Sequence, residues 1–230
     1  MIPLTTTRPA KNDRAVAHDP TGRLPGLAGA LSVAAMIAAF MVVPADSGGA
    51  APADIIQRYA DGSDGYLRTT VLESLSMMLL IVLIAGLCDL LRRRPGGELS
   101  ATVVGLGGGV VAACQLVGYG LIATLALGTA ERGDEAVVMA VYDASAVAFV
   151  VSYVGLALAC LGTAAVLIRG ASGHRVAGGI SLLVGTTAVV GATAYAAEGA
   201  LSPHGDLSFL VLLLQLLWSV TVSVSMLRQR

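Results

Sequence analysis

Long apolar runs separated by short polar segments are the dominant pattern of this 230-residue chain. Each run is close to the roughly 20 residues that a helix needs to cross the hydrocarbon of a bilayer. Backbone groups in lipid must hydrogen-bond to one another, so we expect these runs to be helices. The predicted membrane spans are the six segments 27–43, 70–91, 102–127, 137–168, 176–197 and 207–227.

The composition supports a membrane protein. Hydrophobic residues make up 56% of the chain and charged residues only 13%, with a mean hydropathy of +0.80. A soluble domain carries about 25% charged residues. We therefore predict an all-α, integral membrane six-helix bundle over residues 26–230. Residues 1–25 are polar and rich in Pro and Thr, which predicts a disordered cytoplasmic tail.

The basic residues are distributed unevenly between the segments that join the spans. Eleven Lys and Arg residues fall in alternate segments, beginning with the N-terminal one, and only Arg58, Arg68 and Arg132 fall in the others. Cytoplasmic loops carry an excess of Lys and Arg, so both termini are predicted to be cytoplasmic, in the plasma membrane of the cell. Without a basic face, the sequence gives no support to nucleic-acid binding.

The first apolar run permits a second interpretation. A basic leader, the apolar run and then the small-residue segment "ADSGGAAPA" also fit a long signal peptide with a cleavage site. Cleavage would leave five spans with the same orientation. We favour a retained span, because the leader is unusually long and the run is long enough to stay in the membrane.

The segment after the first span contains a short amphipathic pattern. Ile55, Ile56, Tyr59 and Ala60 recur at helical spacing, which predicts a short helix lying on the outer surface.

Glycine-rich and cysteine positions within the spans favour packing over chemistry. The stretch "GLGGG" at 105–109 follows no predicted strand, so it lacks the context of a nucleotide-binding loop. Gly105 and Gly109 instead put two small residues on one helix face, which favours close helix packing. The three cysteines fall at different depths and are interpreted as small buried hydrophobes. No metal or cofactor is predicted.

Three acids share one level near the outer boundary of the membrane. Counted at the helical rise, Glu73, Asp143 and Glu198 lie roughly 27, 37 and 35 Å above the inner edges of their spans. Charged groups near a bilayer are costly unless they face protein or water, so we expect an inward-facing cluster with Glu73, Asp143 and Glu198 as candidate catalytic carboxylates.

Other polar and aromatic residues fall at or near the level of these acids and are the candidate ligand-binding set. They are Gln115, Tyr119, Tyr142, Tyr195, His204, Asp206 and Gln215. Together they predict a polar cavity that opens to the outer face. The alternative is that these are separate residues, which bond at helix ends and between helices or touch headgroup water.

Two stretches resemble a known family. They are "DIIQRYADGSDGYLRTTVLESLSMMLLIVLIAGLCDLLRR", with its short helix before the second span, and the hairpin "LACLGTAAVLIRGASGHRVAGGISLLVG". Through them, residues 26–228 resemble a large family of bacterial six-span membrane proteins of unknown function. The proline usual in that family's inner turn does not occur between Arg169 and Arg175. The resemblance implies the six-span fold and assigns no functional residue.

Two classes of function fit these features. The first is binding of a small lipophilic molecule in the outward-facing cavity, by a protein that lies in the lipid bilayer and forms either a homo-oligomer or a complex with a partner subunit. The second is a cofactor-independent intramembrane enzyme, an isomerase or cyclase, that uses the carboxylates as general acid and base. Proton-coupled transport would suit the same acids but is less favoured, because no acid reaches mid-membrane and no span has an obvious proline break.

Overall fold

The protein is a bundle of long helices. A computed structural model describes residues 23–43, 51–170, 172–195, 202–203 and 205–228, and over these residues it contains helices and no strand. The all-α prediction is therefore confirmed. The helices in chain order are α1 Leu24–Val42, α2 Pro52–Asp61, α3 Ser63–Arg92, α4 Glu98–Thr124, the π-helix η2 Leu125–Thr129, α5 Ala130–Arg132, α6 Glu135–Leu167, α7 Ser172–Gly191 and α8 Asp206–Leu227.

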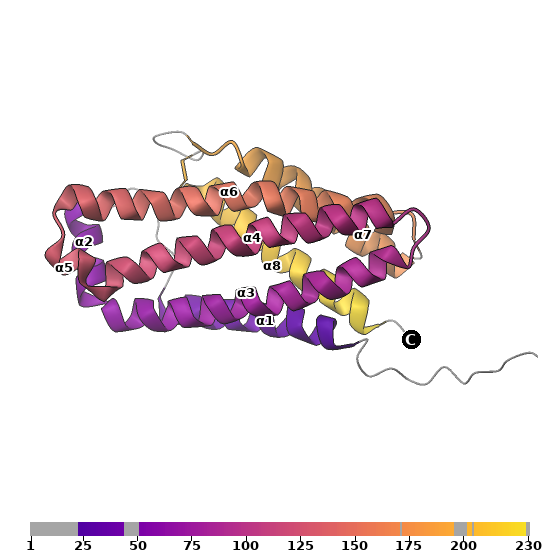
Figure 1. Ribbon diagram of the computed structural model, residues 1–230, viewed down its shortest axis with the longest axis horizontal. Coiled ribbons are helices and arrows are strands. Elements are labelled where there is room, and N and C mark those ends of the chain that lie inside the picture. Colours follow the sequence, from indigo (N-terminus) through magenta and orange to yellow (C-terminus); the bar gives the residue numbers. More distant parts are fainter. Residues whose placement is uncertain (1–22, 44–50, 171, 196–201, 204, 229–230) are drawn as a thin grey trace, which may run out of the picture.

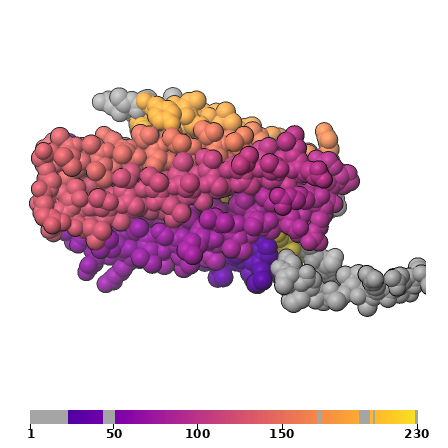
Figure 2. Space-filling view, viewed as in Figure 1, coloured from indigo at the N-terminus to yellow at the C-terminus, as the bar shows by residue number. Residues whose placement is uncertain are grey.

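The long helices lie along one axis, and α8 crosses them obliquely (Figure 1). On the face seen in Figure 2, the atoms of α3, α4 and α6 meet side by side. The bundle has two different ends. The short helices α2 and α5 lie at one of them (Figure 1), which we call the α2 end.

Within the described residues, five helices are long and apolar enough to cross a membrane: α1, α3, α6, α8 and the unit Glu98–Arg132 that begins with α4. This is what a multi-pass membrane protein requires. The helix α7, with His174 and Arg175 in its first turn, is not one of the five. Most observed bounds lie near the predicted ones, but α3 begins at Ser63 rather than at residue 70, and α7 ends at Gly191 rather than at residue 197.

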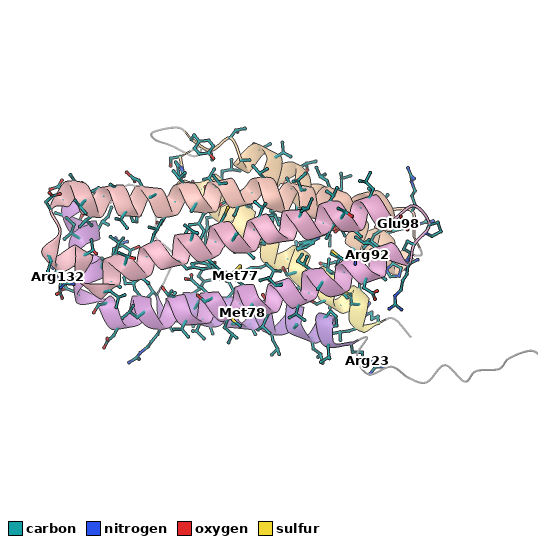
Figure 3. All side chains as sticks on the ribbon, viewed as in Figure 1. Arg23, Met77, Met78, Arg92, Glu98 and Arg132 are labelled. Carbon is teal, nitrogen blue, oxygen red and sulfur yellow. The ribbon has the colours of Figure 1, made fainter. Side chains whose placement is uncertain are left out.

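The outside of the bundle is apolar, as lipid contact demands. Met77 is 1% exposed in α3, whereas its neighbour Met78 is 63% exposed and points away from the bundle (Figure 3). In α4, Leu106 is likewise 67% exposed. Such apolar surface would be unfavourable in water and is expected of helices in hydrocarbon.

Basic residues gather at the end of the bundle opposite α2. Arg94, after α3, contacts His174 of α7, which in turn contacts Ser225 near the end of α8. The start of α1 lies at the same end, because Gly26 lies against Leu227. This is the arginine-rich end, and its described arginines are Arg23, Arg92, Arg93, Arg94, Arg169, Arg175 and Arg228. Figure 3 labels Arg23 and Arg92 at this end and Arg132 at the other.

Hydrogen bonds between serines join α1 to α3. The Ser32 hydroxyl donates to the Ser76 carbonyl at 2.8 Å, and the Ser76 hydroxyl donates to the Ser32 carbonyl at 2.9 Å. Both side chains are buried, and their small size lets the two backbones approach. The first helix is thus packed into the bundle.

Glycine sets the approach of α4 to α6, but not at the predicted positions. A Cβ on Gly107 would lie 2.5 Å from the Gly155 carbonyl oxygen, and one on Gly155 would lie 2.5 Å from the Gly107 carbonyl oxygen. A Cβ on Gly109 would meet nothing within 4 Å, and one on Gly105 would lie 3.4 Å from the Cys88 sulfur. Gly107 therefore makes the close contact that the sequence analysis assigned to Gly105 and Gly109.

The helix predicted around Ile55 and Tyr59 is confirmed as α2, and it has a buried face. Ile55 is 3% exposed and Tyr59 is 2% exposed. Both belong to an apolar cluster with Leu125 of η2 and Val138 of α6. The helix closes the α2 end of the bundle with this face. Burial raises the pKa of Tyr59, and the neighbouring Tyr66 and Tyr142 raise it further.

Candidate functional site

A cavity lies in the half of the bundle nearer to α2. Its volume is about 210 Å³, whereas a single water molecule needs roughly 10–15 Å³. One face from each of α1, α3, α4, α6 and α8 lines it, together with Tyr59 of α2. Each of these faces follows helical spacing, as Gln115, Tyr119 and Ile122 do on α4. The cavity is therefore built from the inward stripes of five long helices, with α2 across the end.

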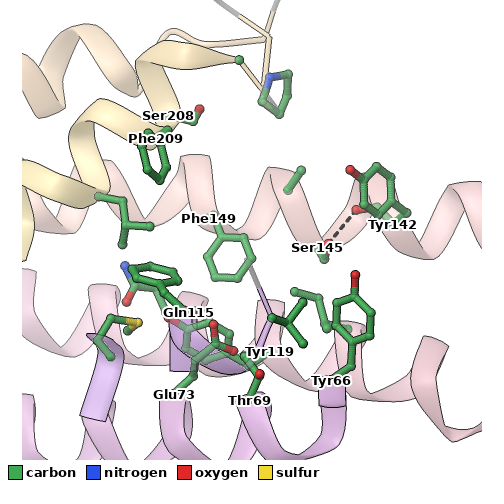
Figure 4. Close-up of a pocket in the computed structure, with 18 of the residues that line it drawn as sticks. Tyr66, Thr69, Glu73, Gln115, Tyr119, Tyr142, Ser145, Phe149, Ser208 and Phe209 are labelled. Atoms are coloured by element: carbon green, nitrogen blue, oxygen red, sulfur yellow. Dashed lines mark hydrogen bonds between the residues drawn. The ribbon is translucent and has the colours of Figure 1, made fainter. Parts of the chain in front are cut away.

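The polar wall of the cavity comes from α3. Tyr66, Thr69 and Glu73 are spaced at i, i+3 and i+7, so their side chains share one face of this helix (Figure 4). Glu73 is only 8% exposed. A carboxyl group thus belongs to the wall of an otherwise largely apolar cavity.

The opposite wall comes from α6, where Tyr142, Ser145 and Phe149 line the cavity at i, i+3 and i+7 (Figure 4). The Ser145 hydroxyl donates to the Tyr142 carbonyl at 2.6 Å, so its hydrogen is used within the helix. The ring of Phe149 lies 5.2 Å from the ring of Tyr119 on α4, measured between centroids. Aromatic rings from α4 and α6 therefore meet in the lining of the cavity.

A cluster of tyrosines closes the α2 end of the cavity. The Tyr59 ring stacks on the Tyr66 ring at a centroid distance of 4.2 Å. It also meets the Tyr142 ring edge-on at 6.3 Å. These contacts join α2, α3 and α6, so α2 positions the outer part of the cavity as well as covering the bundle.

Amide groups lie on the side of the cavity away from α2. Gln115 of α4 lines the cavity, is 2% exposed and donates to the Gln215 side-chain oxygen at 3.0 Å. It also donates to the Ser152 hydroxyl of α6 at 3.4 Å. Gln215 of α8 is buried behind it at 3% exposure and does not line the cavity. These bonds tie three helices together and fix the position of Gln115.

Polar atoms without hydrogen-bond partners are concentrated in residues of the cavity wall. Among the described residues, four buried side-chain N or O atoms have no hydrogen-bond partner. Three of them belong to residues that line this cavity: Glu73 Oε2, the Tyr66 hydroxyl and the Ser208 hydroxyl. Buried polar groups nearly always find partners in folded proteins. Their concentration here is what a site for a hydrogen-bonding molecule requires.

The structure brings some of the predicted residues together and separates others. Glu73, Gln115, Tyr119 and Tyr142 line the cavity. Asp143, Tyr195 and Asp206 are exposed and do not line it. Glu198 and His204 lie outside the described residues. The expected cluster of three acids is therefore not assembled in the described part of the chain, where Glu73 is the one acid that faces the cavity.

Asp143 lies outside the cavity for a geometric reason. Successive residues of an α-helix point about 100° apart. Since Tyr142 faces the cavity, the next side chain on α6 points away from it, and Asp143 is exposed. The sequence predicts the level of Asp143 along its helix but not the face on which it lies.

Several lining residues were missed by the sequence analysis. They are Tyr59, Tyr66, Thr69, Ser145, Phe149, Tyr153 and Ser208. A signal for some of them was present. Tyr66, Thr69 and Glu73 form a polar stripe at helical spacing, and Tyr142, Ser145 and Phe149 form another. Aligning such stripes on different spans would have predicted this wall.

The described residues contain no group of three or more His, Cys, Asp or Glu side chains that could hold a metal ion. Comparison with known proteins gave no match to a family model, to a curated protein or to a solved structure. The resemblance to a six-span bacterial family therefore brings nothing to the site, and the function is argued from geometry.

Proposed function

We propose that the chain is a six-span protein of the plasma membrane, with both termini in the cytoplasm, whose cavity binds a small lipophilic molecule. The five apolar helices support the membrane assignment. Seven described arginines lie at the end opposite to α2, which supports a cytoplasmic position for that end. On this topology α7 supplies the sixth span, and α1 is retained because it is packed against α3 through Ser32 and Ser76.

One observation carries the binding proposal: three buried, unpartnered polar atoms belong to residues that line one largely apolar cavity. Ligand sites are typically concave and mostly apolar, with a few polar groups that orient the ligand. The Phe149 and Tyr119 rings would bury an apolar body, while Glu73 and Tyr66 would bind its polar group. The cavity lies in the half of the bundle that this topology puts toward the outside.

The proposal is tested by filling the cavity. Ala146 is 5% exposed and lines the cavity, whereas Ala144 on the same helix is exposed. Thermal unfolding of the purified protein in phosphatidylcholine nanodiscs is measured with a panel of small neutral and cationic aryl compounds. We expect stabilisation by at least one of them, lost in Ala146→Phe and kept in Ala144→Phe. Stabilisation by none, or equal stabilisation of both variants, would contradict the proposal.

One of the three acids in the enzyme hypothesis, Glu73, lines the cavity. The unpartnered oxygen of Glu73 favours this hypothesis, because an acid on a residue that lines an apolar cavity can protonate a bound molecule. Any compound that binds is incubated with the wild type and with Glu73→Gln, and the products are separated by mass spectrometry. Conversion by the wild type alone would support an isomerase or cyclase, and recovery of unchanged compound from both would leave binding as the function.

A further inference from the structure

Among the described residues that line the cavity, Glu73 is an acid and no basic residue accompanies it. Glu73 is 8% exposed, and its Oε2 has no hydrogen-bond partner among the described residues. The described residues that line the cavity include no Lys, Arg or His. A buried carboxylate is costly unless a positive group or several hydrogen bonds compensate its charge. A positively charged ligand would therefore complement Glu73 best.

The aromatic lining adds a second, independent preference for a cation. Tyr119 and Phe149 pack with ring centroids 5.2 Å apart, and both rings line the same cavity as Glu73 (Figure 4). Tyr59 and Tyr66 stack at 4.2 Å at its α2 end. The face of an aromatic ring attracts an ammonium group electrostatically, and cages of such rings recognise quaternary ammonium ions. The rings also exclude water, which strengthens attraction to the carboxylate.

We propose that the ligand of this cavity is a hydrophobic ammonium ion, with its cationic nitrogen at Glu73 and its apolar groups against Tyr119 and Phe149. This inference rests on the proposed binding function and names the chemical class of its ligand. A neutral molecule could hydrogen-bond to Tyr66, Ser208 and Glu73 Oε2, but only a cation would also balance the charge of the Glu73 carboxylate in its ionised form.

The test uses two molecules of the same shape and different charge. Phenyltrimethylammonium and tert-butylbenzene differ by the replacement of a cationic nitrogen with carbon. Binding to the full chain in phosphatidylcholine nanodiscs is measured by equilibrium dialysis, with empty nanodiscs as the blank. We expect the wild type to bind the cation at least about tenfold more tightly than the neutral molecule. We expect Glu73→Gln to lose this preference while still binding tert-butylbenzene.

Asp143→Asn is the matched control, because it removes an exposed carboxylate that does not line the cavity. It should keep the preference for the cation. Equal loss in Asp143→Asn and Glu73→Gln would mean that surface charge attracts the cation, and would overturn the assignment. The assignment would also be overturned if the wild type bound tert-butylbenzene as tightly as the cation.

These outcomes separate the inference from the function on which it rests. If tert-butylbenzene binds as well as the cation and Ala146→Phe abolishes its binding, the cavity is a binding site for neutral molecules and only the charge assignment is wrong. If neither molecule binds the wild type, both proposals fail. If the preference survives in Glu73→Gln, the cation binds elsewhere, and the inference is refuted.

Discussion

The side chains of Gln115 on α4 and Gln215 on α8 exchange hydrogen bonds inside the bundle. Gln115 donates to the Gln215 oxygen at 3.0 Å, and Gln215 donates to the Gln115 oxygen at 3.5 Å. The two residues are 100 positions apart and are 2% and 3% exposed. The pair fixes α8 against α4 beside the cavity, and it explains why two amides occur in otherwise apolar spans.

Breaking this pair should destabilise the protein. In Gln215→Leu, the Gln115 amide loses a partner in a buried position, and we expect a loss of about 1–2 kcal/mol in the free energy of unfolding. The double variant Gln115→Leu/Gln215→Leu removes both amides and should recover part of that loss. Unfolding in detergent micelles, arranged as a double-mutant cycle, measures the coupling. Additive losses would show that the two side chains do not interact.

The approach of α4 to α6 depends on Gly107. In Gly107→Ala the new methyl group would lie 2.5 Å from the Gly155 oxygen and 2.7 Å from the Ala159 nitrogen, both of which are backbone atoms that cannot rotate away. We expect about 1–3 kcal/mol of destabilisation. Gly109→Ala is the control, because its methyl group meets nothing within 4 Å and Ala favours the helix by about 1 kcal/mol. Equal effects of the two substitutions would contradict this packing.

The sequence predicted the helices well, because the length of an apolar run is a local property. The direction of a side chain around a helix was harder, since every face of a membrane span is apolar and gives little contrast. Gly107 was therefore missed beside Gly105 and Gly109, and Asp143 was expected inside. The side of a helix that faces inward depends on the neighbouring helices, and their positions do not follow from the local sequence.

The same reasoning applies to α2. Its amphipathic pattern predicted a helix with one apolar face, which the structure confirms. The partner of that face was not predictable from the segment itself. Tyr59 reaches Tyr66 across a short turn, but it also meets Tyr142, which is far along the chain. The cavity depends on contacts of this second kind.

At the arginine-rich end, His174 should make stability depend on pH. Arg94 can only donate, so its 2.9 Å bond makes the His174 Nε2 an acceptor, and the Nδ1 hydrogen is assigned to the 3.2 Å contact with the Ser225 hydroxyl. Burial, and then the Arg94 charge, lower the pKa of His174. The unfolded chain therefore binds this proton more readily than the folded one. The stability that neutral His174 contributes is fully present above about pH 6.5, the pKa of an unfolded His. It is lost as the pH falls below about 6.5 toward the pKa of His174 in the folded protein.

His174→Gln tests this dependence, because Gln can accept from Arg94 and donate to Ser225 without titrating. Chemical unfolding between pH 5 and pH 8 should show a smaller loss of stability on acidification in His174→Gln than in the wild type. Arg93→Gln, which removes an exposed partner of Asp89 at the same end, should leave the pH dependence unchanged. Identical slopes for the wild type and His174→Gln would refute the role of His174.

The proposed topology predicts which introduced cysteines react in intact cells. Glu135 begins α6 at the α2 end, Glu98 begins α4 at the arginine-rich end, and both are exposed. A maleimide that cannot cross membranes should label Glu135→Cys in intact cells and Glu98→Cys only after permeabilisation. The wild type corrects for Cys88, Cys114 and Cys160, two of which are buried. The arginine-rich end is expected to be cytoplasmic. Labelling of Glu98→Cys in intact cells, with protection of Glu135→Cys, would show the opposite orientation, with the cavity toward the cytoplasm.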